Sequence, residues 1–438
     1  MSEITFDDIY LKARLISEGV HIRTPLEDLP FDLRGMADRN SSDEVIDFEI
    51  PEKVDVNDID NLMELMLKYP VYSTPNTDLG TSLIMDGSKL WLPIYPNKHS
   101  RLEYTLENGI GTIYERDQVL ATGRLRERPE WLDIKLSNGL SIDAALPAAS
   151  VSTINVVLSL SCMNYNTKRG CRYCNFFANP VSKKISMLPK DTLKDWAHYQ
   201  AEAVKIATEG GWRGVIALSG GALAPAQRGE YLERLEIVIN ALREKINEEV
   251  LAELTLVYNY YAPEDFSDMK KWKELGIIAT SIDLEVMDAA YFSAICPAKA
   301  AYKPHEYWKK AQEAAVDVFG PLYSTGCVVM GIEPMSTLVN GIDERLSKGV
   351  MPNILMFFST PGSAYWGFRP PTASWIVEAS NKIVDSFLKY APKWIAKSQR
   401  MAKKEGKGKS ELKIDRDGRM SIVFDELARR LKEIGMKT

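Results

Sequence analysis

The segment Cys162-Met-Asn-Tyr-Asn-Thr-Lys-Arg-Gly-Cys171-Arg-Tyr-Cys174 contains three of the five cysteines of the chain. Thiolates in that number indicate a soft metal centre, either zinc or iron–sulfur. Closed zinc sites and electron-carrying clusters take four protein ligands, and the next histidine, His198, lies well beyond Cys174 in a predicted helix. Three thiolates on a four-iron cluster would leave one iron open to a small molecule, so the segment predicts a reaction site.

The residues around this segment predict alternating strands and helices. Strands are expected at 154–161, 215–219, 254–258, 277–282, 325–330 and 354–358, and helices at 193–207, 231–242, 266–275, 307–319 and 338–346. Six strands in alternation with helices favour an α/β fold with a parallel sheet closed or partly closed into a (β/α)6-type barrel. Right-handed crossovers bring every carboxyl strand end to one rim, and the cysteine segment follows the first strand there.

The chain is expected to contain three parts. Residues 1–148 predict an N-terminal accessory domain, with an acidic helical and loop segment followed by a small β-sheet. Residues 131–135 are expected to form one of its strands, and Asn138-Gly139 is a strong hairpin signal. Residues 149–370 form the predicted barrel, and 371–438 a helical C-terminal extension.

Composition narrows the class of protein. The 438 residues carry 54 Lys and Arg against 60 Asp and Glu, a net charge of −6 that gives no strong signal for nucleic acid. No apolar run is long enough for a membrane span, and the acidic N-terminus lacks the layout of a secretion signal. Five cysteines are too few for a disulfide scaffold. We therefore expect a cytoplasmic protein with a small-molecule substrate.

Several motifs in this order resemble the radical S-adenosylmethionine (SAM) superfamily, and within it the biotin-synthase-like group. Tyr173 precedes the third cysteine as the superfamily motif prefers. Ser219-Gly220-Gly221-Ala222 ends the second strand, where the group has Gly-Gly-Glu. Val329-Met-Gly331-Ile-Glu333 is similar to the group's I-x-G-x-E adenine-contacting element, and Ser359-Thr-Pro361-Gly362-Ser363 resembles its P-G-T turn. The resemblance covers about residues 150–370.

The resemblance implies a 4Fe–4S cluster held by Cys162, Cys171 and Cys174, with SAM bound at the open iron. Reductive cleavage of SAM would give a 5′-deoxyadenosyl radical that abstracts hydrogen from a substrate in the barrel. The cluster would be oxygen-labile and would need a flavodoxin- or ferredoxin-type electron donor. SAM contacts are then expected from Tyr173, Gly220, Gly221, Glu285, Lys299 and Glu333.

Two departures from the family pattern matter for this assignment. The first cysteine gap holds eight residues instead of the usual three, and the extra residues are expected to loop out because longer flexible loops cost little entropy. Ala222 stands in place of the glutamate, so the methionine amino group would use the Gly220 and Gly221 carbonyls or another carboxylate. Glu285 is our candidate for that carboxylate, and Lys299 is a candidate for the SAM carboxylate.

Alternatives remain for several of these residues. Glu333 is equally suited to capping the following helix. Cys296 and Cys327 are expected to pack as small hydrophobic residues, with an auxiliary thiol as the other interpretation of Cys296. Trp366 and Phe368 are expected to close a core. The alternative function is a non-catalytic iron–sulfur or zinc scaffold or assembly protein.

Overall fold

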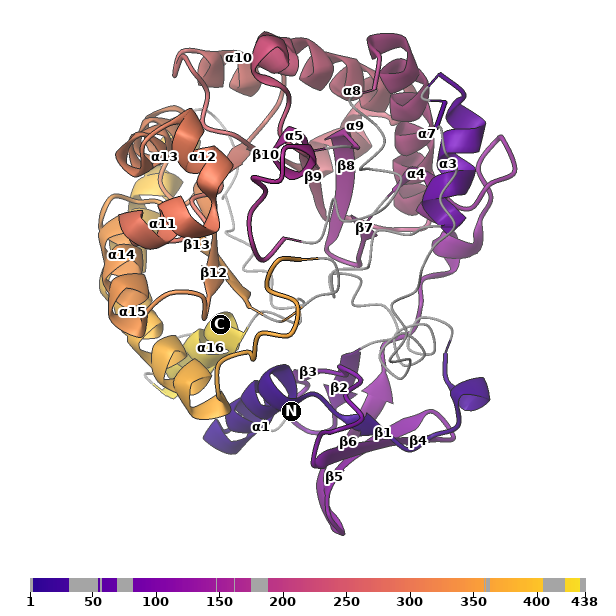
Figure 1. Cartoon of the computed structure of the whole chain (residues 1–438), viewed down its shortest axis with the longest axis vertical. Helices are drawn as coiled ribbons and strands as arrows, with labels where there is room; N and C mark the ends of the chain where they lie inside the picture. The colour runs from indigo at the N-terminus through magenta and orange to yellow at the C-terminus, as the bar shows by residue number, and fades with distance from the viewer. Residues whose placement is uncertain are drawn as a thin grey trace.

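The computed structural model describes residues 3–30, 54–55, 57–68, 82–146, 148–160, 162–174, 188–357, 359, 363–404 and 422–433 (Figure 1). Its larger sheet has the strand order β13-β12-β11-β10-β9-β8-β7. The strands are β7 (Ala148–Ala149), β8 (Thr153–Ser159), β9 (Val215–Gly220), β10 (Thr255–Tyr260), β11 (Ala279–Ile282), β12 (Ser324–Met330) and β13 (Met351–Met356). Strands β8 to β13 pair in parallel and β7 is antiparallel to β8.

Helices cover the outside of this curled sheet, as Figure 1 shows. They are α7 (Lys190–Glu209), α8 (Tyr231–Lys245), α9 (Glu248–Glu253), α10 (Asp268–Glu274), α13 (His305–Phe319) and α14 (Met335–Ser347), with α11 (Ala289–Ile295) and α12 (Pro297–Tyr302) between β11 and α13. The predicted partial barrel is confirmed. Because its strands run parallel, their carboxyl ends share one rim.

The local sequence explains why these segments pack as they do. Strand β8 has consecutive buried residues from Val156 to Ser159, as expected for a strand covered on both faces. Helix α7 buries Leu193, Trp196, Ala197 and Val204 at helical spacing, so one face lies on the sheet.

The prediction of a strand at 131–135 is wrong. Residues Glu130–Asp133 form a 3-10 helix, η2. A strand would place the adjacent side chains of Trp131 and Leu132 on opposite faces, whereas both are buried in the same hydrophobic cluster. Trp131 also lies directly against Gly210. Burial of two neighbouring side chains on one side therefore overrides the strand propensity.

The N-terminal part forms a second sheet with the order β1-β4-β5-β6-β2-β3. Its strands are β1 (His21–Ile22), β2 (Ser82–Met85), β3 (Trp91–Pro93), β4 (Leu102–Glu107), β5 (Ile110–Glu115) and β6 (Gln118–Leu125). All its pairs are antiparallel except β1 with β4. The predicted small β-sheet is therefore present.

The two ends of the described chain pack together. Helix α1 (Phe6–Glu18) shares a hydrophobic cluster with α15 (Ala373–Lys404) and α16 (Ile422–Glu433). The helical C-terminal extension is as expected, and the division into three domains stays a prediction. No helix within the described ranges combines the length and the apolar character that crossing a bilayer requires.

A buried ion pair fastens α1 to α16. Lys12 Nζ lies 2.5 Å from Asp425 Oδ2, and the two side chains are 0% and 5% exposed. We expect Asp425→Ala to lower the free energy of unfolding by about 3 kcal/mol, because a buried ammonium loses its carboxylate. Arg430, also on α16, forms a more exposed pair with Asp385 of α15, so Arg430→Ala should cost less than about 1 kcal/mol. Urea denaturation measures both, and equal effects would contradict the prediction.

Candidate active site

Main-chain hydrogen bonds fasten the cysteine segment to three other elements at the carboxyl rim. Met163 N donates to Ala222 O (2.9 Å), beside the Gly-Gly motif after β9. Arg172 N donates to Ile295 O (2.9 Å) at the end of α11, and Tyr365 N donates to Arg172 O (3.0 Å). The structure thus brings together segments that the sequence places far apart.

The extra residues between Cys162 and Cys171 form a short helix and contact the barrel. Met163–Asn166 forms a short helix, α5, and the Asn164 side-chain amide donates to the Tyr261 hydroxyl. Ala298 N donates to Arg169 O (3.3 Å). The insertion therefore supplies additional contacts to the barrel rim.

Glu285 and Lys299, both predicted to contact SAM, form a buried ion pair. Lys299 Nζ lies 2.6 Å from Glu285 Oε1 and also donates to Asp283 O at 2.8 Å. Each side chain is 9% exposed. Burial alone would lower the pKa of Lys299, but Glu285 and the neighbouring thiols and Asp283 together raise it well above its ordinary value. The ammonium also faces the Trp308 ring, 5.1 Å from its centroid.

Glu285 holds an unusual backbone conformation. Its φ is 68°, in the left-handed region that residues other than glycine seldom adopt. Its main chain extends the pairing of β11 with β12, since Glu285 N donates to Cys327 O (2.7 Å) and Val329 N donates to Glu285 O (2.8 Å). Such strain is kept only where the surroundings enforce it, and it concentrates at functional sites.

Cys171 lies against Cys296, the residue between α11 and α12. A hydrogen bond from the Cys296 thiol lowers the pKa of Cys171, and burial raises the pKa of Cys296. Burial also raises the pKa of Tyr173, which lies close enough to the Glu285 carboxylate to feel its charge. Cys296 and Cys327 are both buried, as expected, but Cys296 contacts a predicted cluster ligand as well as packing.

Asp283 belongs to the same group of residues and was missed in the sequence. Its Oδ1 accepts hydrogen bonds from Ser281 Oγ (2.6 Å) and Cys327 N (2.8 Å). Burial, followed by the charge of Glu285, raises the pKa of Asp283 to about 6. The alternation Ser281-Ile-Asp283-Leu-Glu285 was the available signal, because it places both carboxylates on one face.

Gly220 is required where β9 passes β8. A Cβ at Gly220 would lie 2.9 Å from Ser159 N and 3.0 Å from Ser159 O. The Tyr260 hydroxyl donates to Gly221 O, so a buried tyrosine from β10 supports the turn in which SAM contacts are predicted.

The Glu333 carboxylate is occupied by donors of the chain itself. Its two oxygens accept from Met287 N (2.7 Å) and Asp288 N (3.0 Å) just before α11, and from Thr337 Oγ1 (2.9 Å) in α14. The following helix, α14, has no side-chain cap, so Glu333 takes its main-chain donors from the start of α11 instead of capping α14 as the alternative expected. The role of Glu333 in binding SAM stays a prediction. Gly331 in the same motif has a φ of 107°, and a Cβ there would lie 2.3 Å from Pro371 Cγ.

The expectation that Trp366 and Phe368 close a core is wrong. They are 55% and 58% exposed. The turn at 364–367 presents them outward because the ring that packs against the barrel core is the one just before them in sequence, Tyr365. Pro361 and Gly362 of the predicted P-G-T turn lie outside the described residues.

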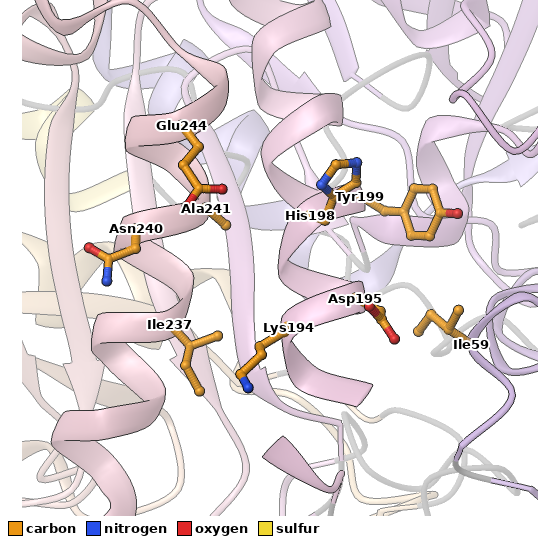
Figure 2. Close-up of a pocket in the computed structure, with 9 residues that line it drawn as sticks. All are labelled: Ile59, Lys194, Asp195, His198, Tyr199, Ile237, Asn240, Ala241 and Glu244. Atoms are coloured by element: carbon orange, nitrogen blue, oxygen red, sulfur yellow. The ribbon is translucent and has the colours of Figure 1, made fainter. Parts of the chain in front are cut away.

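A groove of about 570 Å³ lies elsewhere, between α7 and α8 (Figure 2). It is lined by Ile59, Lys194, Asp195, His198, Tyr199, Ile237, Asn240, Ala241 and Glu244. None of the predicted site residues lines it. Because His198 lies in this groove on the helical layer, the structure agrees that it is a poor ligand for the cysteine segment.

One relative covers most of the chain. A protein of Chlorobaculum limnaeum, bacteriochlorophyllide c C-7(1)-hydroxylase, is 40% identical over 358 residues, which are 81% of this chain and 88% of that protein. This chain belongs to the same hydroxylase family. Family membership makes it an enzyme. Its identification as a radical SAM enzyme with a 4Fe–4S cluster and SAM is carried by the sequence motifs and stays a prediction. No protein-family model matches the chain.

Solved structures overlap this hydroxylase-family chain only partly. The FeFe-hydrogenase maturase HydG from Carboxydothermus hydrogenoformans is 16% identical with a TM-score of 0.37, covering 54% of this chain and 52% of its own. Methylornithine synthase (PylB) is 14% identical with a TM-score of 0.36, covering 70% and 91%. The radical SAM methyltransferase TsrM from Kitasatospora setae is 10% identical with a TM-score of 0.35, covering 55% and 42%. Overlaps of this size carry no functional argument.

Cysteine thiolates are the donors that a 4Fe–4S cluster takes, and the cysteine segment supplies three of them. Cys162, Cys171 and Cys174 are partly buried thiols on one anchored segment. Within the part of the chain that the structure describes, no three His, Cys, Asp or Glu side chains are placed to hold a metal ion. The assignment of these cysteines as ligands, and of the other residues as SAM contacts, therefore stays a prediction.

The raised pKa of Asp283 predicts a pH dependence of stability. Its carboxyl binds a proton up to about pH 6 in the folded enzyme, and only up to about pH 4 when unfolded. The folded state therefore holds more protons between these values, and stability falls as pH rises from about 4 to 6. Asp283→Asn should lack this fall. The free energy of unfolding of the variant, relative to that of the wild type, should therefore increase as pH rises across that range. A constant difference between the two proteins over the range would contradict the prediction.

Proposed function

We propose that this enzyme hydroxylates an alkyl carbon on the ring system of a bacteriochlorophyllide, a planar tetrapyrrole acid. The observation that supports this most is the 40% identity to the C-7(1)-hydroxylase over 88% of that protein. An identity of this extent spans the segment from the N-terminal sheet into the barrel, so the likeness is not confined to a cofactor motif. The related hydroxylase also has a small-molecule substrate, in line with the charge balance of this chain.

Cys162, Cys171 and Cys174 are the proposed cluster ligands, and three ligands would leave one iron of a four-iron cluster open to SAM. When bound, the cluster and SAM supply a radical able to remove hydrogen from an unactivated carbon. The overall change balances as R–H + SAM⁺ + H₂O → R–OH + methionine + 5′-deoxyadenosine + H⁺. A flavodoxin- or ferredoxin-type donor supplies one electron for the cleavage of SAM. The substrate gives one electron back when it is oxidised, so the overall equation contains none.

Glu285 and Lys299 are the proposed partners of the SAM amino-acid group. The free enzyme holds them as a mutual ion pair with 2.6 Å between Nζ and Oε1. An amino acid is a zwitterion, so its ammonium matches Glu285 and its carboxylate matches Lys299. Exchange of partners would preserve the number of ion pairs and avoid a buried charge without a counter-charge. The strained backbone of Glu285 supports this role, because such strain concentrates at functional sites.

Anaerobic reconstitution tests the proposal. The wild type should bind about four irons per chain, and with reductant, SAM and bacteriochlorophyllide c it should form 5′-deoxyadenosine and a hydroxylated pigment. Cys171→Ala should lose the cluster and SAM cleavage, whereas Cys327→Ala, a buried thiol outside the segment, should keep both. Glu285→Gln should keep its iron but bind SAM about tenfold more weakly, since a buried charge–charge contact is lost.

Three outcomes would count against the proposal. Stoichiometric zinc without SAM cleavage would favour the scaffold alternative. Full turnover by Cys171→Ala would remove the cysteine segment from the reaction. Unchanged SAM affinity in Glu285→Gln would remove that residue from the site.

A further inference from the structure

Two large aromatic side chains are exposed at the carboxyl rim. Trp366 and Phe368 have the highest exposed fractions among the large hydrophobic residues of the described chain, at 55% and 58%. They follow β13, the last parallel strand, and Figure 1 shows the orange segment that leads into α15 on the inner side of the ring of helices. Exposed aromatic side chains next to a reaction site favour ligand binding over packing.

The turn that carries them is held rigidly against the cysteine segment. Gly367 N donates to Ser359 Oγ (2.7 Å), which in turn donates to Tyr365 O (3.1 Å). Tyr365 N donates to Arg172 O (3.0 Å), between Cys171 and Cys174. The Tyr365 and Phe368 rings lie 4.7 Å apart with an interplanar angle of 34°. One side of Phe368 is thus fixed by Tyr365, and its remaining surface is open.

A positive charge lies beside these rings. Arg172 is a direct neighbour of the turn, since its carbonyl oxygen accepts the hydrogen bond from Tyr365 N. Arg172 is exposed, and it has no ion-pair partner in the described ranges. Arg369, next to Phe368, is exposed as well. Guanidinium groups suit carboxylates because they offer two parallel N–H donors.

We propose that Trp366 and Phe368 form a binding platform for the flat face of a tetrapyrrole macrocycle, with Arg172 as the partner of its free carboxylate. This assignment rests on the proposed function and names the residues that select its substrate. The conjugated ring stacks on the two aromatic side chains, and the acid group fixes its rotation. The anchored turn then sets where the ring lies relative to the cysteine segment. A neutral or compact substrate would gain little from such a surface.

Binding of bacteriochlorophyllide c and of its methyl ester to the reconstituted enzyme, without reductant, tests the platform. Without reductant no turnover occurs, and the pigment's own fluorescence reports binding. Trp366→Ala and Phe368→Ala should each weaken binding of both pigments about tenfold. Arg172→Gln should weaken binding of the acid to the level of the ester and leave the ester unchanged. Phe6→Ala removes a similarly exposed aromatic, 48% exposed, from α1 and should change nothing.

The outcomes separate this inference from the proposed function. If the wild type binds the pigment and the three rim variants bind it equally well, the platform is wrong and the hydroxylase proposal stands. If neither the wild type nor Phe6→Ala binds either pigment, the proposed substrate class is wrong and the platform falls with it. Iron content of Arg172→Gln, expected to match the wild type, shows that weaker binding is not a loss of the cluster.

Discussion

The main-chain bonds that hold the cysteine segment to its neighbours are the constraint on which the site depends. Thiolates can serve one metal centre only if the backbone that carries them is fixed, and this backbone is fastened at Met163, Arg169 and Arg172. The partners come from the turn after β9, the α11–α12 junction and the turn after β13. A parallel barrel makes this possible because it brings those turns to one rim.

A second constraint acts inside the barrel, where charges are held away from water. An isolated buried carboxylate or ammonium is costly, and Glu285 and Lys299 offset that cost for each other. The left-handed backbone conformation of Glu285 has a free-energy cost of the order of 1 kcal/mol. The pairing with β12 and the ion pair must balance this cost. Strain together with a buried charge pair at a strand end is more typical of a binding site than of a scaffold.

The barrel was predictable because its signals are local. Alternating apolar runs and helical spacing identify each strand and helix from β8 to β13, and strand ends then place Gly220, Glu285 and Glu333 near the rim. The contact of Cys171 with Cys296 and the Tyr260 hydroxyl on Gly221 depend on how distant turns pack. The role of Asp283 depends on burial, which residue type alone does not reveal. Trp366 and Phe368 were misjudged for the same reason, since an exposed and a buried aromatic look alike in a sequence.

We propose that Cys162, Cys171 and Cys174 hold a cluster whose fourth iron is open. Electron paramagnetic resonance of the reduced, reconstituted enzyme with and without SAM tests it most directly. The cluster signal should change on addition of SAM, because SAM would bind the iron itself, and Glu285→Gln should need more SAM for the same change. An intact cluster whose signal is indifferent to saturating SAM would mean that a side chain already occupies the fourth iron, and would contradict the account.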